Sequence, residues 1–133
     1  MKHPKIPFLL AITTAGLLLY GCFLGPEREP CTGRLIVENP IPDTTVAVGD
    51  TLFIDLAYPP AFVSSEGNIT YIPSIKQGSN YVNINKMENP NDNQRLSILL
   101  IIGESFGDAI LELGANSGCL ENSTTFNVTV TDP

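Results

Sequence analysis

Thr124-Thr125-Phe126-Asn127-Val128-Thr129-Val130-Thr131 is the stretch that decides the fold most clearly. Apolar side chains at positions 126, 128 and 130 alternate with polar ones at positions 125, 127, 129 and 131. An alternation of period two puts one set of side chains on the buried face of a β-strand and the other set in solvent. We therefore predict a half-buried strand over residues 124–131, with Phe126, Val128 and Val130 in the core.

The same alternation recurs upstream and is interrupted by Gly, Pro, Asn and Asp about every ten residues. Pro73 indicates a strand at a sheet edge or one with a bulge. Residues 62–68 are expected as a loop and residues 116–122 as a turn that carries Cys119, and no stretch has the pattern of an amphipathic helix. Seven or eight short strands of this kind predict an all-β chain folded as an antiparallel β-sandwich. The expected strands cover residues 34–37, 44–48, 51–57, 69–75, 81–85, 96–102, 108–115 and 124–131.

Two parts of the chain resemble a known group of domains. Ile41-Pro42-Asp43-Thr44-Thr45-Val46-Ala47-Val48-Gly49-Asp50-Thr51 resembles the opening of bacterial immunoglobulin-like and cadherin-like domains, and residues 107–113 with 125–130 resemble their last two strands. The resemblance implies an immunoglobulin-like β-sandwich over residues 33–133. Calcium-binding relatives carry an acidic cluster where this chain reads Ala57-Tyr58-Pro59-Pro60-Ala61, and the polar turn at residues 88–94 lacks EF-hand spacing. We therefore expect no metal and no cofactor.

The N-terminus has the features of an export signal. Lys2 and Lys5 precede an almost wholly apolar run of about fifteen residues, which is short of the roughly 20 that span a bilayer as a helix. Leu19-Tyr20-Gly21-Cys22 resembles the lipobox of bacterial lipoproteins, with Tyr20 bulkier than the usual residue there. The resemblance implies a signal peptide at residues 1–21, a lipid on Cys22 and a tether at residues 22–32. An uncleaved signal anchor and ordinary secretion are the alternatives.

The remaining cysteines, Cys31 and Cys119, form a natural pair. Disulfides form in oxidising compartments outside the cytosol, and export of the chain provides such a compartment. We predict a Cys31–Cys119 disulfide, with two free thiols as the alternative. In the chain-entropy model a loop of this length stabilises the fold by about 4–5 kcal/mol.

The charge of the chain limits its partners. Seven basic residues stand against fourteen acidic ones, a net charge of −7. Loss of residues 1–21 removes Lys2 and Lys5, leaving five basic residues against fourteen acidic ones and a net charge of −9. An anionic body is repelled by phosphate backbones, so no nucleic acid is expected as a partner. Membrane attachment is expected through the lipid on Cys22.

Candidate binding residues lie beside the longest loops. Tyr58, Phe62 and Tyr81 could stack on a sugar ring or contact a protein, or they could simply close the end of the sandwich. The only histidine, His3, lies in the predicted signal peptide, and no nucleophile has an evident base, so we expect no enzyme.

These features together predict a bacterial cell-envelope lipoprotein. By resemblance, Phe23 directly after the lipobox cysteine favours the outer membrane. The domain is expected to be a non-catalytic structural or protein-interaction module. The alternative is a carbohydrate-binding module at the cell surface.

Overall fold

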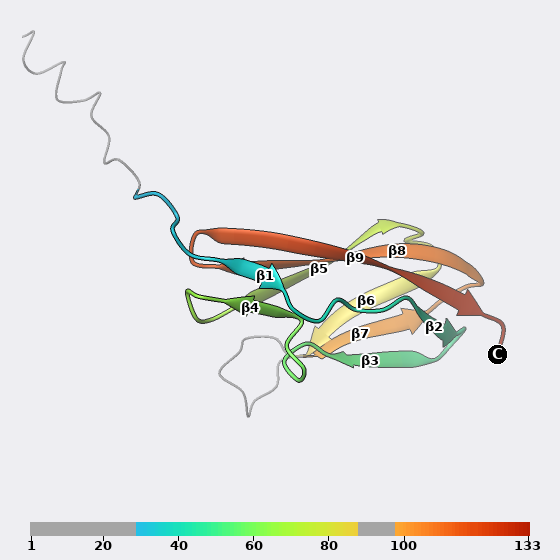
Figure 1. Cartoon of the computed structure of the whole chain (residues 1–133). Helices are drawn as coiled ribbons and strands as arrows, with labels where there is room; N and C mark the ends of the chain where they lie inside the picture. The colour runs from blue at the N-terminus through green and yellow to red at the C-terminus, as the bar shows by residue number, and fades with distance from the viewer. Residues whose placement is uncertain (1–28, 88–97) are drawn as a thin grey trace, which may run out of the picture. The chain divides into compact units, whose positions relative to one another are not determined.

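The computed structural model describes residues 29–87 and 98–133. These residues form nine β-strands and no helix (Figure 1). The strands are β1 (Leu35–Val37), β2 (Thr44–Ala47), β3 (Thr51–Asp55), β4 (Phe62–Ser64), β5 (Thr70–Gln77), β6 (Val82–Met87), β7 (Ile98–Gly103), β8 (Gly107–Ser117) and β9 (Leu120–Thr131). The cysteine at the predicted lipobox and the polar turn at residues 88–94 lie outside the described residues.

The strands form two main sheets. One has the order β2-β9-β8-β5, the other has the order β3-β7-β6, and β1 pairs with β4 as a small separate ribbon. In Figure 1 the two main sheets are stacked as two layers within the compact unit Cys31–Pro133. The sheets β3-β7-β6 and β9-β8-β5 reproduce the B-E-D and G-F-C orders of an immunoglobulin-like sandwich. The predicted fold class is therefore confirmed.

One pairing differs from the antiparallel prediction. β2 runs parallel to β9, with Thr44 opposite Val128 and Ala47 opposite Thr131. Pro40 and Pro42 have no backbone N–H and interrupt the chain between β1 and β2. After this break the chain continues beside β9, so the first strand of the sandwich is divided between two sheets.

The core follows the predicted alternation. Phe126, Val128 and Val130 on β9 are buried. The buried core also includes residues of four other predicted strands, namely Leu56, Tyr71, Leu99, Ile101, Ala109, Leu111 and Leu113. The Tyr71 ring is fully buried, and its hydroxyl donates to the Leu56 carbonyl oxygen at 3.0 Å. In β7 the buried positions alternate with half-buried ones, so only one face of this apolar strand is fully covered.

Part of one expected loop is a strand, since residues 62–64 form β4. The expected turn at residues 116–122 is present but tighter, between Ser117 and Leu120, because β8 and β9 extend into it. Gly118 makes this turn possible because its φ is +60°, a left-handed conformation that glycine adopts at little cost. The hydroxyl of Ser64 donates to that of the buried Ser117 at 2.6 Å and links the two regions.

The edge prediction for Pro73 is correct. Pro73 lies on β5, which is an edge strand, and the β5–β8 register shifts between Ile75 and Gln77. A proline is tolerated here because an edge strand has one side without a pairing strand.

Candidate functional site

The predicted loop site is not assembled, first because Phe62 is part of the core. Phe62 begins β4 and is only 1% exposed, and its ring packs against Tyr71 with 6.2 Å between ring centroids. The proposal that Phe62 contacts a ligand is therefore wrong. Residues 62–64 are a strand whose first side chain faces inward. The strand is followed by polar residues, so the sequence shows no apolar alternation that would predict it.

Tyr58 and Tyr81 lie at opposite ends of the domain. β3 and β6 both pair antiparallel with β7, so they run in the same direction. Tyr58 follows the end of β3, whereas Tyr81 directly precedes the start of β6. Tyr58 is 71% exposed and Tyr81 is half-buried. The two tyrosines therefore cannot contact one small ligand together.

The Tyr81 end instead presents an aromatic residue that sequence reasoning missed. The Tyr81 carbonyl oxygen accepts the N–H groups of Glu104 at 2.8 Å and Ser105 at 3.3 Å. The Tyr81 ring lies over Gly107, where a Cβ atom would be 2.6 Å from it. Tyr81 thus holds the connection between β7 and β8, and the Phe106 side chain in this connection is 67% exposed. The sequence feature that could have indicated Phe106 is its place in the short connection between Gly103 and Gly107.

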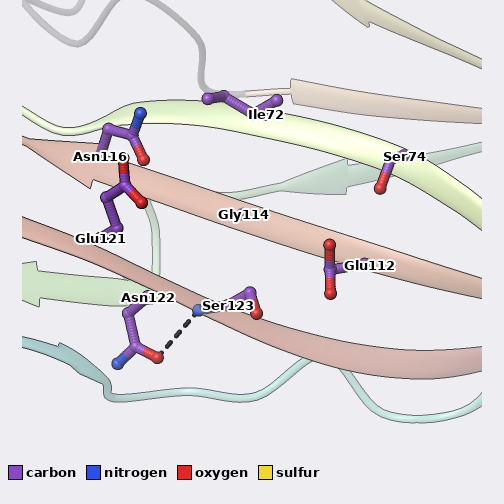
Figure 2. A pocket seen from close by; sticks show the side chains of 8 residues that line it. All are labelled: Ile72, Ser74, Glu112, Gly114, Asn116, Glu121, Asn122 and Ser123. Carbon is purple, nitrogen blue, oxygen red and sulfur yellow. Dashed lines mark hydrogen bonds between the residues drawn. The ribbon is translucent and has the colours of Figure 1, made fainter.

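The outer face of the β5-β8-β9 sheet carries an open groove of about 440 Å³. Gly114 on β8 has no side chain and leaves a depression between Ile72 on β5 and Ser123 on β9 (Figure 2). Ile72 is 49% exposed. The groove is lined by Ile72, Ser74, Glu112, Gly114, Asn116, Glu121, Asn122 and Ser123.

The polar groups of this groove are partly engaged with the protein itself. Glu112 forms an ion pair with Lys76 at 2.8 Å. The Asn122 side chain accepts the N–H of Ser123 and donates to the Leu35 carbonyl oxygen, both at 2.8 Å. The remaining hydroxyl, amide and carboxylate groups suit hydrogen bonding to a neutral or cationic ligand. A serine hydroxyl without a neighbouring oriented base does not make a hydrolytic site.

A second surface is apolar and lies on the other sheet. Phe53 on β3 points away from the core and is 61% exposed. Its cross-strand neighbour is the half-buried Leu100 on β7, and Met87 is exposed at the end of β6. Phe53 is the more exposed of the two, compared with Met87 at 45%.

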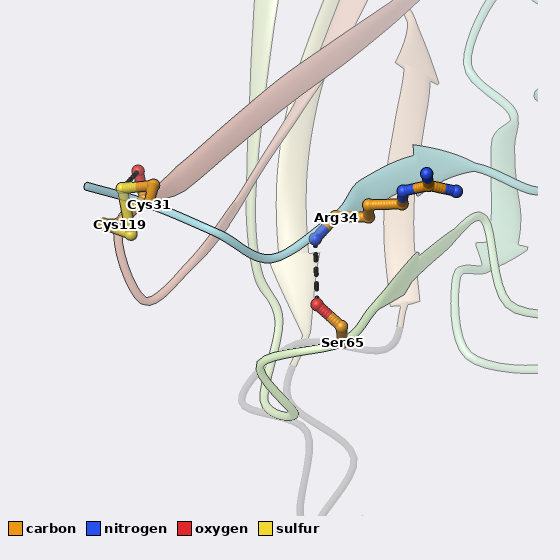
Figure 3. The surroundings of a disulfide bond; sticks show 4 residues. All are labelled: Cys31, Arg34, Ser65 and Cys119. Carbon is orange, nitrogen blue, oxygen red and sulfur yellow. Dashed lines mark hydrogen bonds between the residues drawn. A yellow bond between two sulfur atoms is a disulfide. The ribbon is translucent and has the colours of Figure 1, made fainter.

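The disulfide between Cys31 and Cys119 is present, as predicted, with the Cα atoms 6.0 Å apart. It joins the start of the domain to the turn between β8 and β9 (Figure 3). Close by, the Arg34 N–H donates to the Ser65 hydroxyl at 2.8 Å and joins the same N-terminal segment to the end of β4. The lipid on Cys22 remains a prediction.

Asp43 fixes the start of β2 to β9. Its carboxylate accepts the Asn127 backbone N–H at 2.7 Å and the Asn127 side-chain amide at 3.0 Å. The side-chain hydrogen bond, followed by the backbone one, lowers the pKa of Asp43 below its ordinary value of 3.8. This carboxylate therefore acts as a structural acceptor.

The described residues contain neither a metal-ligand cluster nor a membrane-spanning helix. Residues 29–87 and 98–133 contain no group of three or more His, Cys, Asp or Glu side chains placed to hold a metal ion. The same residues include no helix long and apolar enough to cross a bilayer.

Comparisons with known proteins identify the fold without identifying a family. No protein-family model matches the chain, and no curated protein matches it. The endo-fucoidan hydrolase MfFcnA4 from glycoside hydrolase family 107 superposes with a TM-score of 0.52 at 15% identity, over 79% of this chain and 14% of the hydrolase. Titin domain M7 superposes with a TM-score of 0.49 at 13% identity, over 77% of this chain and 98% of the titin domain. The PKD domain from KIAA 1837 protein superposes with a TM-score of 0.48 at 18% identity, over 79% of this chain and 92% of the PKD domain chain.

Likeness at these identities concerns the fold alone. This chain spans only about one seventh of the fucoidan hydrolase, and nothing about that enzyme's activity follows for it. The strand order nevertheless defines the class of the domain. The described residues between 31 and 133 form an immunoglobulin-like β-sandwich.

Proposed function

We propose that this protein is a bacterial cell-envelope lipoprotein whose immunoglobulin-like domain is a non-catalytic module that binds other proteins. Acylation of Cys22 anchors the chain, in the outer membrane by its resemblance to known lipoproteins. A single acyl chain holds a protein only marginally, whereas two or more hold it firmly. The lipid, rather than the acidic surface of the domain, provides the attachment.

The observation that carries this proposal is the Cys31–Cys119 disulfide. It uses two of the three cysteines and leaves Cys22 as the single thiol available for a lipid. A structural disulfide also fits an exported protein better than a cytosolic one. The disulfide joins the segment after the tether to the turn between β8 and β9. A force applied at the anchor would therefore act on both of these long strands.

The distribution of exposed aromatic side chains favours a protein partner over a sugar. Phe53, Tyr58 and Phe106 are each more than half exposed, but they lie on a strand and on loops at opposite ends of the domain. A carbohydrate-binding module would need aromatic rings side by side on one platform. Separate apolar positions suit protein contacts, where single aromatic side chains act as anchors. Carbohydrate binding is therefore the less supported alternative.

The anchoring part of the proposal is tested by metabolic labelling. The full chain is expressed in a Gram-negative host with an alkyne-tagged fatty acid, beside Cys22→Ser and the Cys31→Ser/Cys119→Ser double variant. The wild type and the double variant are expected to carry the label in the membrane fraction, whereas Cys22→Ser is not. A labelled Cys22→Ser protein, or an unlabelled wild type, would overturn the anchor.

A further inference from the structure

The β3 strand has an edge that no described strand covers. β3 pairs with β7 and with no other strand of the described residues. In an immunoglobulin-like sandwich the first strand normally lies beside this edge. Here residues 39–42 pass near Ile54 and Asp55 across a hollow of about 200 Å³, and two of them are prolines without an N–H. The backbone N–H of Asn39 donates to the Ala61 carbonyl oxygen at 3.3 Å, and residues 39–42 form no backbone hydrogen bond with β3.

The hydrogen-bond pattern shows which backbone groups face this edge. The Gly103 N–H donates to the Asp50 carbonyl oxygen at 3.1 Å, so Thr51 and Ile102 form a non-hydrogen-bonded pair. Hydrogen-bonded and non-hydrogen-bonded pairs alternate along an antiparallel ladder. Thr51, Phe53 and Asp55 therefore direct their N–H and C=O groups away from β7. They offer a template for another strand.

The other edges of the two main sheets carry devices that discourage pairing, whereas β3 has no proline, lysine or register shift and has one charged residue, Asp55, at its end. β5 has Pro73, Lys76 and a register shift at its edge, and β2 has only four residues. The edge of β6 carries the exposed Lys86. Charged residues, prolines, bulges and short length are the usual means of blocking association at edges. β3 instead presents Phe53 at its centre.

We infer that two copies of this chain associate by pairing their β3 strands antiparallel about a two-fold axis at Phe53. In this register Phe53 of one copy lies opposite Phe53 of the other, and Thr51 lies opposite Asp55. The hydroxyl of Thr51 can then donate to the second oxygen of the Asp55 carboxylate, whose Oδ1 already accepts the backbone N–H groups of Ala57 and Tyr58. The two Asp55 side chains are kept apart. The outward backbone groups of all three residues find partners, so the strand is complementary to itself.

The size and charge of this interface predict a weak dimer. A five-residue edge buries less than the roughly 800 Å² per partner of a standard stable interface. The acidic bodies also repel one another, and salt screens this repulsion. Dimerisation should therefore strengthen with ionic strength, whereas binding to a basic partner would weaken. If the proposed lipid anchor is correct, a shared membrane raises the effective concentration of the two copies.

Sedimentation equilibrium of the mature chain with Cys22→Ser tests the inference. A monomer–dimer equilibrium that strengthens with salt is expected, and Phe53→Lys should weaken it at least tenfold. Phe106→Lys is the matched control, since it replaces a phenylalanine of similar exposure that is not on an edge, and it should change nothing. A chain that stays monomeric at millimolar concentration, or equal effects of both variants, would overturn the inference.

A cross-linking experiment keeps the result independent of folding defects. Phe53→Cys in the same background has one free thiol, which in the proposed register faces its own copy across the axis. Cα atoms of a hydrogen-bonded strand pair lie about 5.5 Å apart, within the range of a disulfide. Mild oxidation should link Phe53→Cys into dimers but not Phe106→Cys, and equal yields would contradict the pairing. A monomeric result leaves acylation of Cys22 untouched, so the two proposals fail separately.

Discussion

The backbone of Gly103 lies so close to Ala47 that a Cβ atom at position 103 would be 2.5 Å from the Ala47 carbonyl oxygen. This contact joins the two sheets, because Ala47 ends β2 in one and Gly103 ends β7 in the other. The Gly49 N–H also donates to the Gly103 carbonyl oxygen at 2.8 Å. A side chain at position 103 would therefore push the two main sheets apart at the ends of β2 and β7.

Gly103→Ala is accordingly expected to destabilise the domain by about 1–3 kcal/mol, the usual cost of overpacking. Urea unfolding followed by circular dichroism measures the change. Gly114→Ala is the matched control, since its Cβ would lie 3.2 Å from the Ile72 carbonyl oxygen and needs only a small adjustment. Equal destabilisation by the two substitutions would contradict the assigned role of Gly103.

The disulfide between Cys31 and Cys119 should be a major contributor to stability. Its long loop restricts the unfolded chain, and loss of the bridge is expected to lower the free energy of unfolding by about 4–5 kcal/mol. Unfolding midpoints of the oxidised protein and of Cys31→Ser/Cys119→Ser give this difference. An unchanged midpoint would show that the bridge contributes little.

The hydroxyl pair of Ser64 and Ser117 links β4 to the β8–β9 hairpin across 53 positions of sequence. Ser117→Ala should cost about 1 kcal/mol, because it removes a buried hydrogen bond. A double-mutant cycle with Ser64→Ala isolates the coupling between the two hydroxyls. Strict additivity of the two substitutions would mean that the pair contributes no interaction energy.

Asp43 gives the domain a defined sensitivity to acid. Its folded-state pKa is lowered, so its contribution is present above the unfolded value and is lost as the pH falls through the lowered folded value. The melting temperature of Asp43→Asn should lie below that of the wild type at neutral pH. The gap should close only as the pH falls below about 3.8. A gap that stays constant to lower pH would contradict this role for the carboxylate.

The sequence predicts which side of a strand is buried better than it predicts which strands pair with one another. The alternation at Phe126, Val128 and Val130 correctly identifies the buried side of β9, and Pro73 correctly identifies an edge. Periodicity reports which side chains share a face of one strand, but it contains no information on which strands lie together. The parallel pairing of β2 with β9 could not be predicted for this reason.

The candidate site was harder to predict for the same reason. Tyr58 and Tyr81 both adjoin loops, but only the common direction of β3 and β6 shows that they occupy opposite ends. Phe62 precedes a polar run and was expected in a loop, yet three residues suffice to form β4 and bury its ring. The open β3 edge depends on where residues 39–42 run, which is a matter of tertiary structure.

Intact-mass spectrometry of the mature protein, purified from membranes, is the most direct test of the proposed anchored module. We expect a chain that begins at Cys22, carries the added mass of acyl groups on that residue, and retains the Cys31–Cys119 disulfide. A chain with an unmodified thiol at Cys22, or with residues 1–21 still attached, would contradict it.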